Sequence, residues 1–213
     1  MQTEVRVPPH EPELAPSAAP PRRWRRRVVA IVLILASLTL VVGAVFVANY
    51  DPVCGNCGGV GGVQGPGAKD LGSYTSPRGE SFNAYSVDLV PGKQFSFWFT
   101  LTNPDHLPVT ITHIGAAPQP YDTFRVARVQ IQSANLGNAP LTAFRPFALS
   151  GPYKDFVNVL VTMQMRRCLS SGGYTEFGSI PVSFKVLGVP RHTDVYLLST
   201  IRLVGTSAVP CNH

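Results

Sequence analysis

Only 14% of the 213 residues are charged, far below the roughly 25% that is usual in soluble domains, while 45% are hydrophobic. The net charge of +6 divides evenly, because residues 1–27 contain six Arg against three Glu and residues 51–213 contain twelve Lys or Arg against nine Asp or Glu. The longer part therefore has no concentrated basic stripe. This argues against nucleic acid as a partner and indicates that apolar residues are gathered in one segment.

The N-terminal tail, residues 1–27, is rich in Pro and Arg. Six of its first 21 residues are proline, and few are large and apolar. Such a segment buries too little surface to offset the entropy lost on ordering it. We therefore expect a disordered cytoplasmic tail.

An uncharged apolar run follows at residues 28–49. A helix rises 1.5 Å per residue, so about 20 residues cross a hydrocarbon core of about 30 Å. The run therefore predicts one transmembrane helix in the plasma membrane. The alternatives are a buried helix of a soluble protein and a secretory signal peptide, although the apolar region of a signal peptide has only about 7–15 residues.

A basic cluster precedes this run and sets the expected orientation. Positive charge is retained on the cytoplasmic side, so the N-terminus is predicted to be cytoplasmic and the C-terminal part extracytoplasmic. Trp24 and Tyr50 are expected at the two membrane interfaces, where amphipathic rings accumulate. The residues that determine topology are Arg22, Arg23, Trp24, Arg25, Arg26 and Arg27.

Residues 50–80 are expected to be a glycine-rich linker, since seven glycines fall within residues 55–67. Cys54 and Cys57 form a C-x-x-C motif at its start. A local disulfide or a bridge to a partner chain is the interpretation we favour. Thiol–disulfide exchange needs a helix N-terminus that this segment lacks, and a zinc site needs two further ligands.

From residue 81 onward, apolar residues alternate with a period of two, which is typical of half-buried strands. In residues 94–102, for example, Phe95, Phe97, Phe99 and Leu101 share one face. The alternation predicts an all-β domain at residues 81–213, an immunoglobulin-like sandwich of about seven strands, with a Greek-key barrel as the alternative. The expected strands are 82–89, 94–102, 108–114, 124–132 (with a bulge near Ala127), 156–165, 180–186 and 195–203.

One part of this domain resembles a known family. The sequence FWFTLTNP at residues 97–104, followed by PVTIT at 108–112, is similar to the strand–turn–strand pattern of major sperm protein and ASH-type immunoglobulin-like domains. FALSG at residues 147–151 is similar to their next turn. The resemblance implies the sandwich fold and a role in binding or scaffolding. The whole arrangement also resembles membrane-anchored envelope proteins of high-GC bacteria.

Two cysteines of the outer domain predict a second disulfide. Cys168 follows the expected strand at 156–165, and Cys211 lies beyond the last strand, on the side of the membrane where oxidation is favoured. The bridge would close a loop of about 44 residues and contribute about 3–4 kcal/mol. Two free buried thiols are the alternative.

No sequence motif of a known catalytic site is present, so we expect a non-enzymatic protein without cofactor or metal. The leading hypothesis is a membrane-tethered extracytoplasmic binding or scaffolding module with an envelope or membrane protein as its partner. A thiol–disulfide or metal-handling protein that uses Cys54 and Cys57 is one alternative. An accessory subunit of a larger membrane complex is the other.

Partner contact is expected in residues 133–153, because loops of more than roughly 12–15 residues are uncommon and often functional. This segment is apolar for a loop, and aromatic and Arg side chains dominate interface energetics. The candidate residues are Phe144, Arg145, Phe147 and Tyr153. The alternative is that Phe147 and Leu149 form an extra edge strand that plugs the sandwich.

Overall fold

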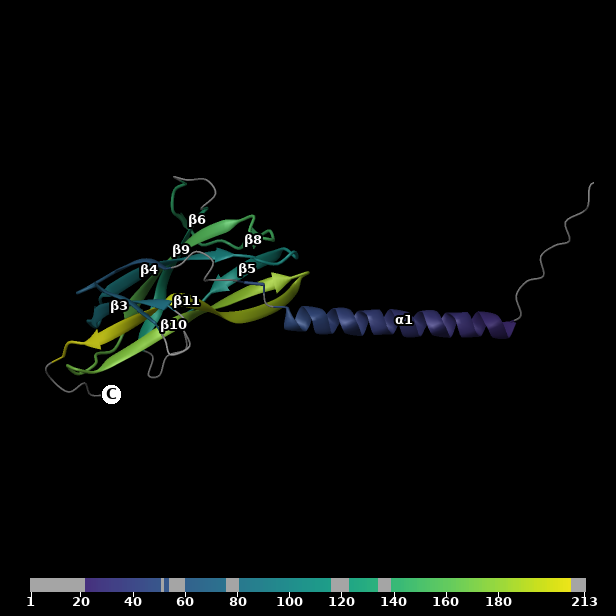
Figure 1. The fold of residues 1–213 in the computed structure, drawn as a ribbon, viewed down its shortest axis with the longest axis horizontal. Helices are drawn as coiled ribbons and strands as arrows, with labels where there is room; N and C mark the ends of the chain where they lie inside the picture. Colours follow the sequence, from purple (N-terminus) through teal and green to yellow (C-terminus); the bar gives the residue numbers. More distant parts are fainter. Residues whose placement is uncertain are drawn as a thin grey trace, which may run out of the picture. The chain divides into compact units, whose positions relative to one another are not determined.

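The computed structural model describes residues 22–50, 52–53, 60–75, 81–115, 123–133 and 139–207. The chain divides into two compact units, Met1–Asn49 and Tyr50–His213. In the first unit the described part is one helix, α1 (Arg22–Asn49). In the second unit the described residues form a two-sheet β-sandwich of eleven strands (Figure 1).

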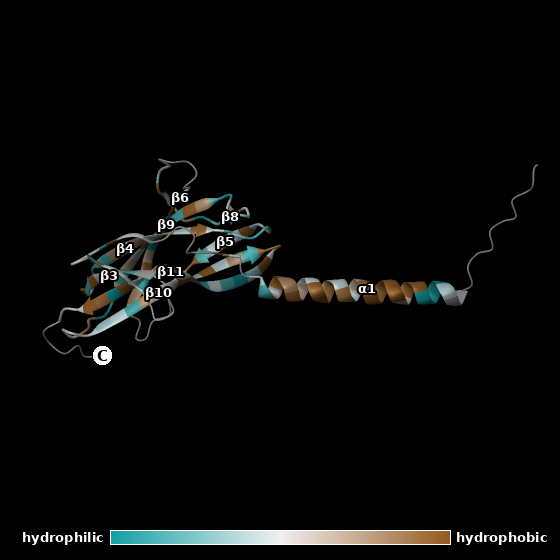
Figure 2. Cartoon of the chain, in the orientation of Figure 1, coloured by the Kyte–Doolittle hydropathy of each residue, from teal (hydrophilic) through white to brown (hydrophobic). Residues whose placement is uncertain are grey.

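Helix α1 is hydrophobic along nearly all of its length, apart from the arginines in its first turns (Figure 2). Its polar side chains bond within the helix: the hydroxyls of Ser37 and Thr39 donate to the carbonyls of Leu33 and Leu35 at 2.8 and 2.9 Å. Such bonds lower the cost of placing a hydroxyl in hydrocarbon. The 24 residues Trp24–Val47 are long and apolar enough to be a membrane anchor or a signal sequence.

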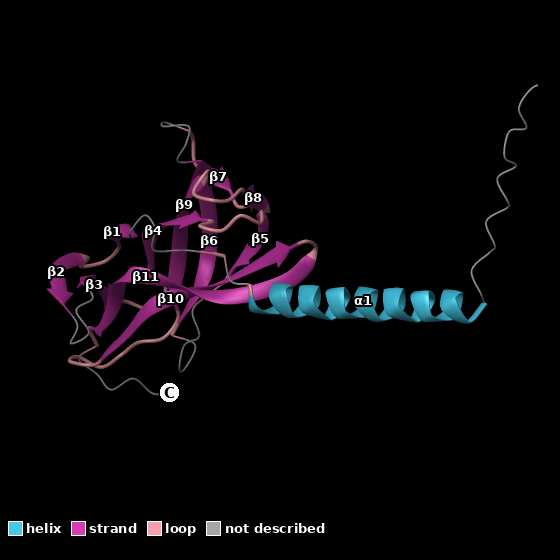
Figure 3. Cartoon of the chain, turned by 45° about the vertical axis from the view of Figure 1, so that its right-hand side comes forward, coloured by secondary structure: helices cyan, strands magenta, loops and turns pink. Residues whose placement is uncertain are grey.

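The sandwich consists of a five-stranded and a six-stranded sheet (Figure 3). The first has the spatial order β1 (Val60–Gln64), β4 (Gln94–Thr102), β9 (Phe156–Met165), β6 (Phe124–Ser133) and β7 (Thr142–Ala143). The second has the order β2 (Lys69–Thr75), β3 (Ser81–Leu89), β11 (Val189–Gly205), β10 (Tyr174–Val186), β5 (Val109–Ile114) and β8 (Phe147–Leu149). Neighbouring strands are antiparallel, except that β3 and β11 run parallel.

The core between the sheets follows the alternation seen in the sequence. Phe95, Phe97, Phe99 and Leu101 of β4 are at most 1% exposed, which confirms the predicted inner face of this strand. Phe177 of β10 packs against Phe95 and Phe97, with ring centroids 6.3 and 5.7 Å apart. Burying one such side chain stabilises the fold by about 1.5–3 kcal/mol, so this aromatic cluster holds the two sheets together.

All seven strands expected from the alternation are present, and the register of β6 shifts between Val126 and Arg128, which confirms the bulge near Ala127. The predicted strand number was too low, however, because β1, β2, β7 and β8 were not expected. Strands β1 and β2 occupy part of the segment 50–80 that was predicted to be a flexible linker. Glycines weaken a strand, but β1 is held by backbone pairing with the strongly apolar β4.

Strands β10 and β11 form a long hairpin that the sequence did not reveal. Val186 pairs with Val189, so the turn consists of two residues, Leu187 and Gly188. Both have left-handed backbone conformations, with φ of 49° and 83°. These angles fit a type I′ turn, whose twist matches that of the flanking strands.

Candidate functional site

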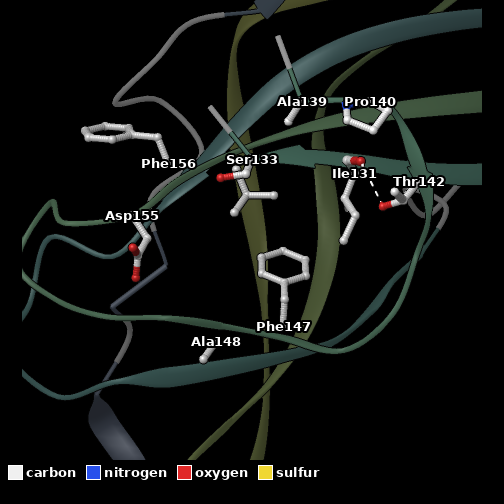
Figure 4. A pocket seen from close by; sticks show the side chains of 10 residues that line it. Ile131, Ser133, Ala139, Pro140, Thr142, Phe147, Ala148, Asp155 and Phe156 are labelled. Atoms are coloured by element: carbon white, nitrogen blue, oxygen red, sulfur yellow. Dashed lines mark hydrogen bonds between the residues drawn. The ribbon is translucent and has the colours of Figure 1, made fainter. Parts of the chain in front are cut away.

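A hollow of about 400 Å³ lies between the edges of the two sheets, where β7 faces β8 (Figure 4). Strand β7 ends the five-stranded sheet, and β8 ends the six-stranded sheet. Both strands come from the segment that crosses from one sheet to the other. The lining residues are Ile131, Ser133, Ala139, Pro140, Thr142, Phe147, Ala148, Asp155, Phe156 and Val157.

Most of the surface of this hollow is apolar, with Ile131, Phe147 and Val157 among the lining side chains. Three side chains contribute oxygen atoms: Ser133, Thr142 and Asp155. The Thr142 hydroxyl donates to the carbonyl of Ile131 at 3.3 Å (Figure 4). An apolar wall with a few placed polar groups suits a ligand that is mainly hydrophobic.

Two aromatic side chains of the crossing segment pack against each other beside the hollow. The rings of Phe144 and Phe147 pack edge to face at 6.0 Å, and both side chains are half-buried. The Phe144 amide donates to the carbonyl of Val129 at 3.1 Å, which ties the segment to β6. Leu149 is fully buried and pairs with Val109.

A network of hydrogen bonds fixes the turn beside the hollow. The Ser150 amide donates to the carboxylate of Asp155 at 2.8 Å. Asn103 is fully buried, and its side-chain amide donates to the carbonyls of Leu107 at 2.7 Å and Leu149 at 3.2 Å. The sequence identified Asn103 only as part of a turn, because such bonds to distant carbonyls leave no local pattern.

The structure brings together two of the four predicted partner-binding residues. Phe147 lines the hollow, and Phe144 packs against Phe147. Arg145 is exposed between them in sequence. Tyr153 is exposed in the turn after β8, outside the lining of the hollow, with a φ of 51°. The segment 133–153 therefore contains two short strands instead of one continuous loop.

The predicted disulfides fall mostly outside the described residues. Cys168 is half-buried shortly after β9, whereas Cys54, Cys57 and Cys211 are not described. A parallel bridge pairs Ser170 with Ser207, and the Ser171 amide donates to the Ser207 carbonyl at 2.8 Å. Ser207, four residues before Cys211, thus lies close in space to Ser170, two residues after Cys168. The pairing of Cys168 with Cys211, and the state of Cys54 and Cys57, stay predictions.

The topology residues belong to the start of α1, which begins at Arg22 and contains Arg23, Trp24, Arg25, Arg26 and Arg27. Tyr50, which is expected at the other membrane interface, is hydrogen-bonded to the β-domain. Its hydroxyl accepts from the Leu107 amide at 3.1 Å and donates to the Leu107 carbonyl at 3.5 Å. Burial raises the pKa of Tyr50 above its ordinary value, opposed by the Leu107 bond and helped by the charge of Asp105. The phenol is therefore part of the β-domain.

Within the described ranges, no three His, Cys, Asp or Glu side chains gather closely enough to hold a metal ion. The hypothesis of a metal-handling role depends on Cys54 and Cys57, which those ranges do not include.

The fold and site define a class: a two-sheet β-sandwich with an apolar hollow at one side, preceded by one long apolar helix. No family model matches the chain, and no curated protein matches it significantly. One similar solved structure is the VesB protease of Vibrio cholerae, at 16% identity and a TM-score of 0.30, over 57% of this chain and 30% of that chain. Another is BcpA, the major pilin subunit of Bacillus cereus, at 9% identity and a TM-score of 0.32, over 69% and 41%. This chain therefore matches less than half of either protein.

Proposed function

We propose that the protein is a membrane-tethered, non-enzymatic binding module of the cell envelope. Its immunoglobulin-like sandwich would hold an extended apolar segment of another envelope protein in the hollow between β7 and β8. The observation that carries this proposal is the hollow itself, which is about 400 Å³ in volume, mainly apolar, and open between two short edge strands.

The proposed tether is helix α1. Its apolar stretch Trp24–Val47 has the length that a bilayer requires, and five arginines precede it or occupy its first turns. The positive-inside rule then assigns the tail to the cytoplasm and the sandwich to the extracytoplasmic side. The sandwich would thus be presented to other proteins of the envelope.

The proposed mode of binding is the addition of a strand beside β8. This strand has three residues and pairs, among the described strands, with β5 alone, and the outer edge of such a strand offers unpaired amide and carbonyl groups. An extended peptide that pairs with this edge would point alternate side chains into the hollow, toward Phe147 and Ile131. The expected ligand therefore has apolar residues at every second position.

The polar groups of the hollow favour binding over catalysis. The Thr142 hydroxyl donates to a backbone carbonyl, and the Asp155 carboxylate accepts from the Ser150 amide. These bonds orient both side chains toward the protein's own backbone. They would fix the shape of the site and leave recognition to apolar contact and backbone pairing.

The test fills the hollow and asks whether the partner is lost. A photo-crosslinking amino acid is placed at Ala148, an exposed lining residue, in the full chain in intact cells. We expect a specific crosslinked adduct that disappears when Thr142→Trp is added. Thr142 is exposed, so the larger ring can enter the hollow without displacing the core.

The matched control is Thr75→Trp, which introduces the same ring at an exposed threonine of β2, the edge strand at the other side of the six-stranded sheet. This variant should keep the adduct. An adduct that forms equally well in Thr142→Trp, or no adduct in the unmodified chain, would show that the hollow is not the binding site.

A further inference from the structure

The turn of the β10–β11 hairpin has an unusual residue at its first central position. Type I′ turns place both central residues in the left-handed region, where Asn or Gly is preferred at the first position. Here the first position is Leu187, with a φ of 49°, and its side chain is 68% exposed. A bulky apolar residue in this conformation is strained and gains nothing from burial within the domain. Such an outlier calls for a functional reason.

The apolar character extends beyond Leu187. Val189, the next side chain after the turn, is 46% exposed, and Lys185 on the other strand is exposed as well. We call Lys185, Leu187 and Val189 the hairpin tip. An apolar tip flanked by a basic side chain suits the interface of a bilayer, where the apolar group enters and the ammonium stays among headgroups.

The pairing of β5 places the hairpin tip at one particular end of the sandwich. Val109 pairs with Val186 of β10 on one side and with Leu149 of β8 on the other (Figure 1 shows β5 between these strands). The chain beyond Val186 and the chain beyond Leu149 therefore emerge at the same end of the sheet. They lie about 10 Å apart, since two strand spacings separate them. The second emerging segment carries Tyr153, which is 52% exposed, and the exposed Lys154.

This end is also where the chain arrives from α1. Tyr50 is the first residue after the helix, and its hydroxyl is hydrogen-bonded to the backbone of Leu107, two residues before Val109. If α1 spans the membrane as proposed above, Tyr50 lies at the bilayer surface. The hairpin tip and Tyr153 belong to the end of the sandwich that Tyr50 joins.

We propose that the hairpin tip, together with Tyr153 and Lys154, is a second membrane contact that seats the sandwich on the lipid interface of the bilayer that α1 enters. Leu187 and Val189 enter the headgroup boundary, Tyr153 lies at the level of the headgroups, and Lys154 and Lys185 face anionic lipid. Among the described residues at this end, Lys185 is exposed, whereas Asp105 and Asp155 are half-buried.

The opposite end of the same hairpin provides a control of similar chemistry. Tyr174 is 58% exposed, and the guanidinium of Arg202 lies 4.6 Å from its ring centroid. An exposed aromatic ring thus lies there beside a half-buried Arg202, which also forms an ion pair with Glu176 at 3.4 Å. Strand β10 has 13 residues, which places Tyr174 about 40 Å from the hairpin tip along the strand.

The experiment reconstitutes the full chain in vesicles of phosphatidylcholine and phosphatidylglycerol that carry a photoactivatable group near the lipid headgroup. Labelled peptides are then mapped by mass spectrometry. We expect label in α1 and in residues 185–191, and none around Tyr174. Leu187→Asn should lower the label in residues 185–191 by at least about threefold while α1 stays labelled. The melting temperature should stay equal or rise, because Asn-Gly is the preferred type I′ pair.

The outcomes separate this inference from the proposal on which it rests. Label in α1 without label in residues 185–191 would refute the second contact and leave the anchor standing. Absence of label in α1 would refute the anchor itself. Label that persists in Leu187→Asn would show that the exposed leucine does not carry the contact.

Discussion

Each lateral side of the sandwich is closed by a segment that crosses from one sheet to the other, but one crossing is closely packed and the other leaves a hollow. At one side the chain crosses from the five-stranded to the six-stranded sheet between β1 and β2, and at the other side between β7 and β8. The first crossing packs directly on the core. The second leaves a hollow of about 400 Å³.

The difference lies in the size of the crossing residues. On the β1–β2 side a Cβ atom at Gly65 would lie 2.7 Å from the Cβ of Phe95 and 3.0 Å from Val87, so only glycine permits this approach. The Asp88 amide donates to the Pro66 carbonyl at 2.9 Å and holds the crossing in place. On the β7–β8 side the crossing segment carries Phe144 and Phe147, whose half-buried rings pack edge to face. Glycine thus allows a close approach on one side, while Phe147 borders the hollow on the other.

The largest loss of stability is expected when the predicted disulfide is removed. This bridge is part of neither crossing, so its loss provides a scale for the effects at both. Replacing Cys168 and Cys211 with Ser should lower the free energy of unfolding by about 3–4 kcal/mol, because the predicted bridge would restrict a loop of about 44 residues in the unfolded chain. Denaturation of the full chain in detergent measures the loss, and non-reducing peptide mapping identifies the bridge.

Replacing Cys54 and Cys57 with Ser is the matched control and should leave the stability of the sandwich nearly unchanged. Alkylation of Cys168 in the native protein, or its pairing with Cys54, would contradict the predicted bridge.

The next prediction compares the loss of stability at two residues of the β7–β8 crossing, beside the hollow. Leu149→Ala should cost about 3 kcal/mol, since it removes a fully buried side chain from the core. Phe147→Ala should cost clearly less, because this ring is half-buried and already borders an open hollow. Thermal unfolding of both variants gives the comparison. Equal losses would mean that Phe147 belongs to the sealed core and that the hollow closes in solution.

The smallest loss of stability is expected from a substitution at the closely packed β1–β2 crossing. Gly65→Ala should cost about 1–3 kcal/mol, because the new methyl group overlaps the Cβ of Phe95 and forces the crossing outward. Gly61→Ala, in the strand β1 that ends just before Gly65, is the control, since its Cβ would lie 3.8 Å from the nearest atom, in ordinary contact with Trp98. Its stability should change by less than about 0.5 kcal/mol. If Gly65→Ala is equally neutral, the glycine is not what seals this side.

The central strands of the fold could be predicted from the sequence because each one contains its own alternation of apolar residues. In β4, four alternating apolar residues face the core, and nothing outside the strand is needed to interpret them. The edge strands lack such a pattern. Strand β1 is largely glycine and valine, and β7 has two residues, so their existence depends on pairing with β4 and β6. Pairing between distant segments cannot be deduced from the composition of one of them.

The candidate site could be predicted in part for the same reason. Residues 133–153 are predicted to contact a partner because of their apolar content, and the structure places Phe147 of this segment at the border of the hollow. Asp155 and Ile131 escaped notice, because they line the hollow only after β6 and β8 come together. Leu187 could not be predicted as a turn residue, because leucine is not among the residues that favour turns.

The parallel pairing of β3 with β11 has a consequence for the order of folding. Strand β11 lies between β3 and β10, and it is the last strand of the chain that the structure describes. Until Ser199–Gly205 is available, β2 and β3 have no strand that joins them to the rest of the six-stranded sheet. Such long-range contacts form late, because a long loop must first close. In the topology proposed above, the sandwich would therefore be completed only after nearly all of residues 50–213 had left the translocation channel.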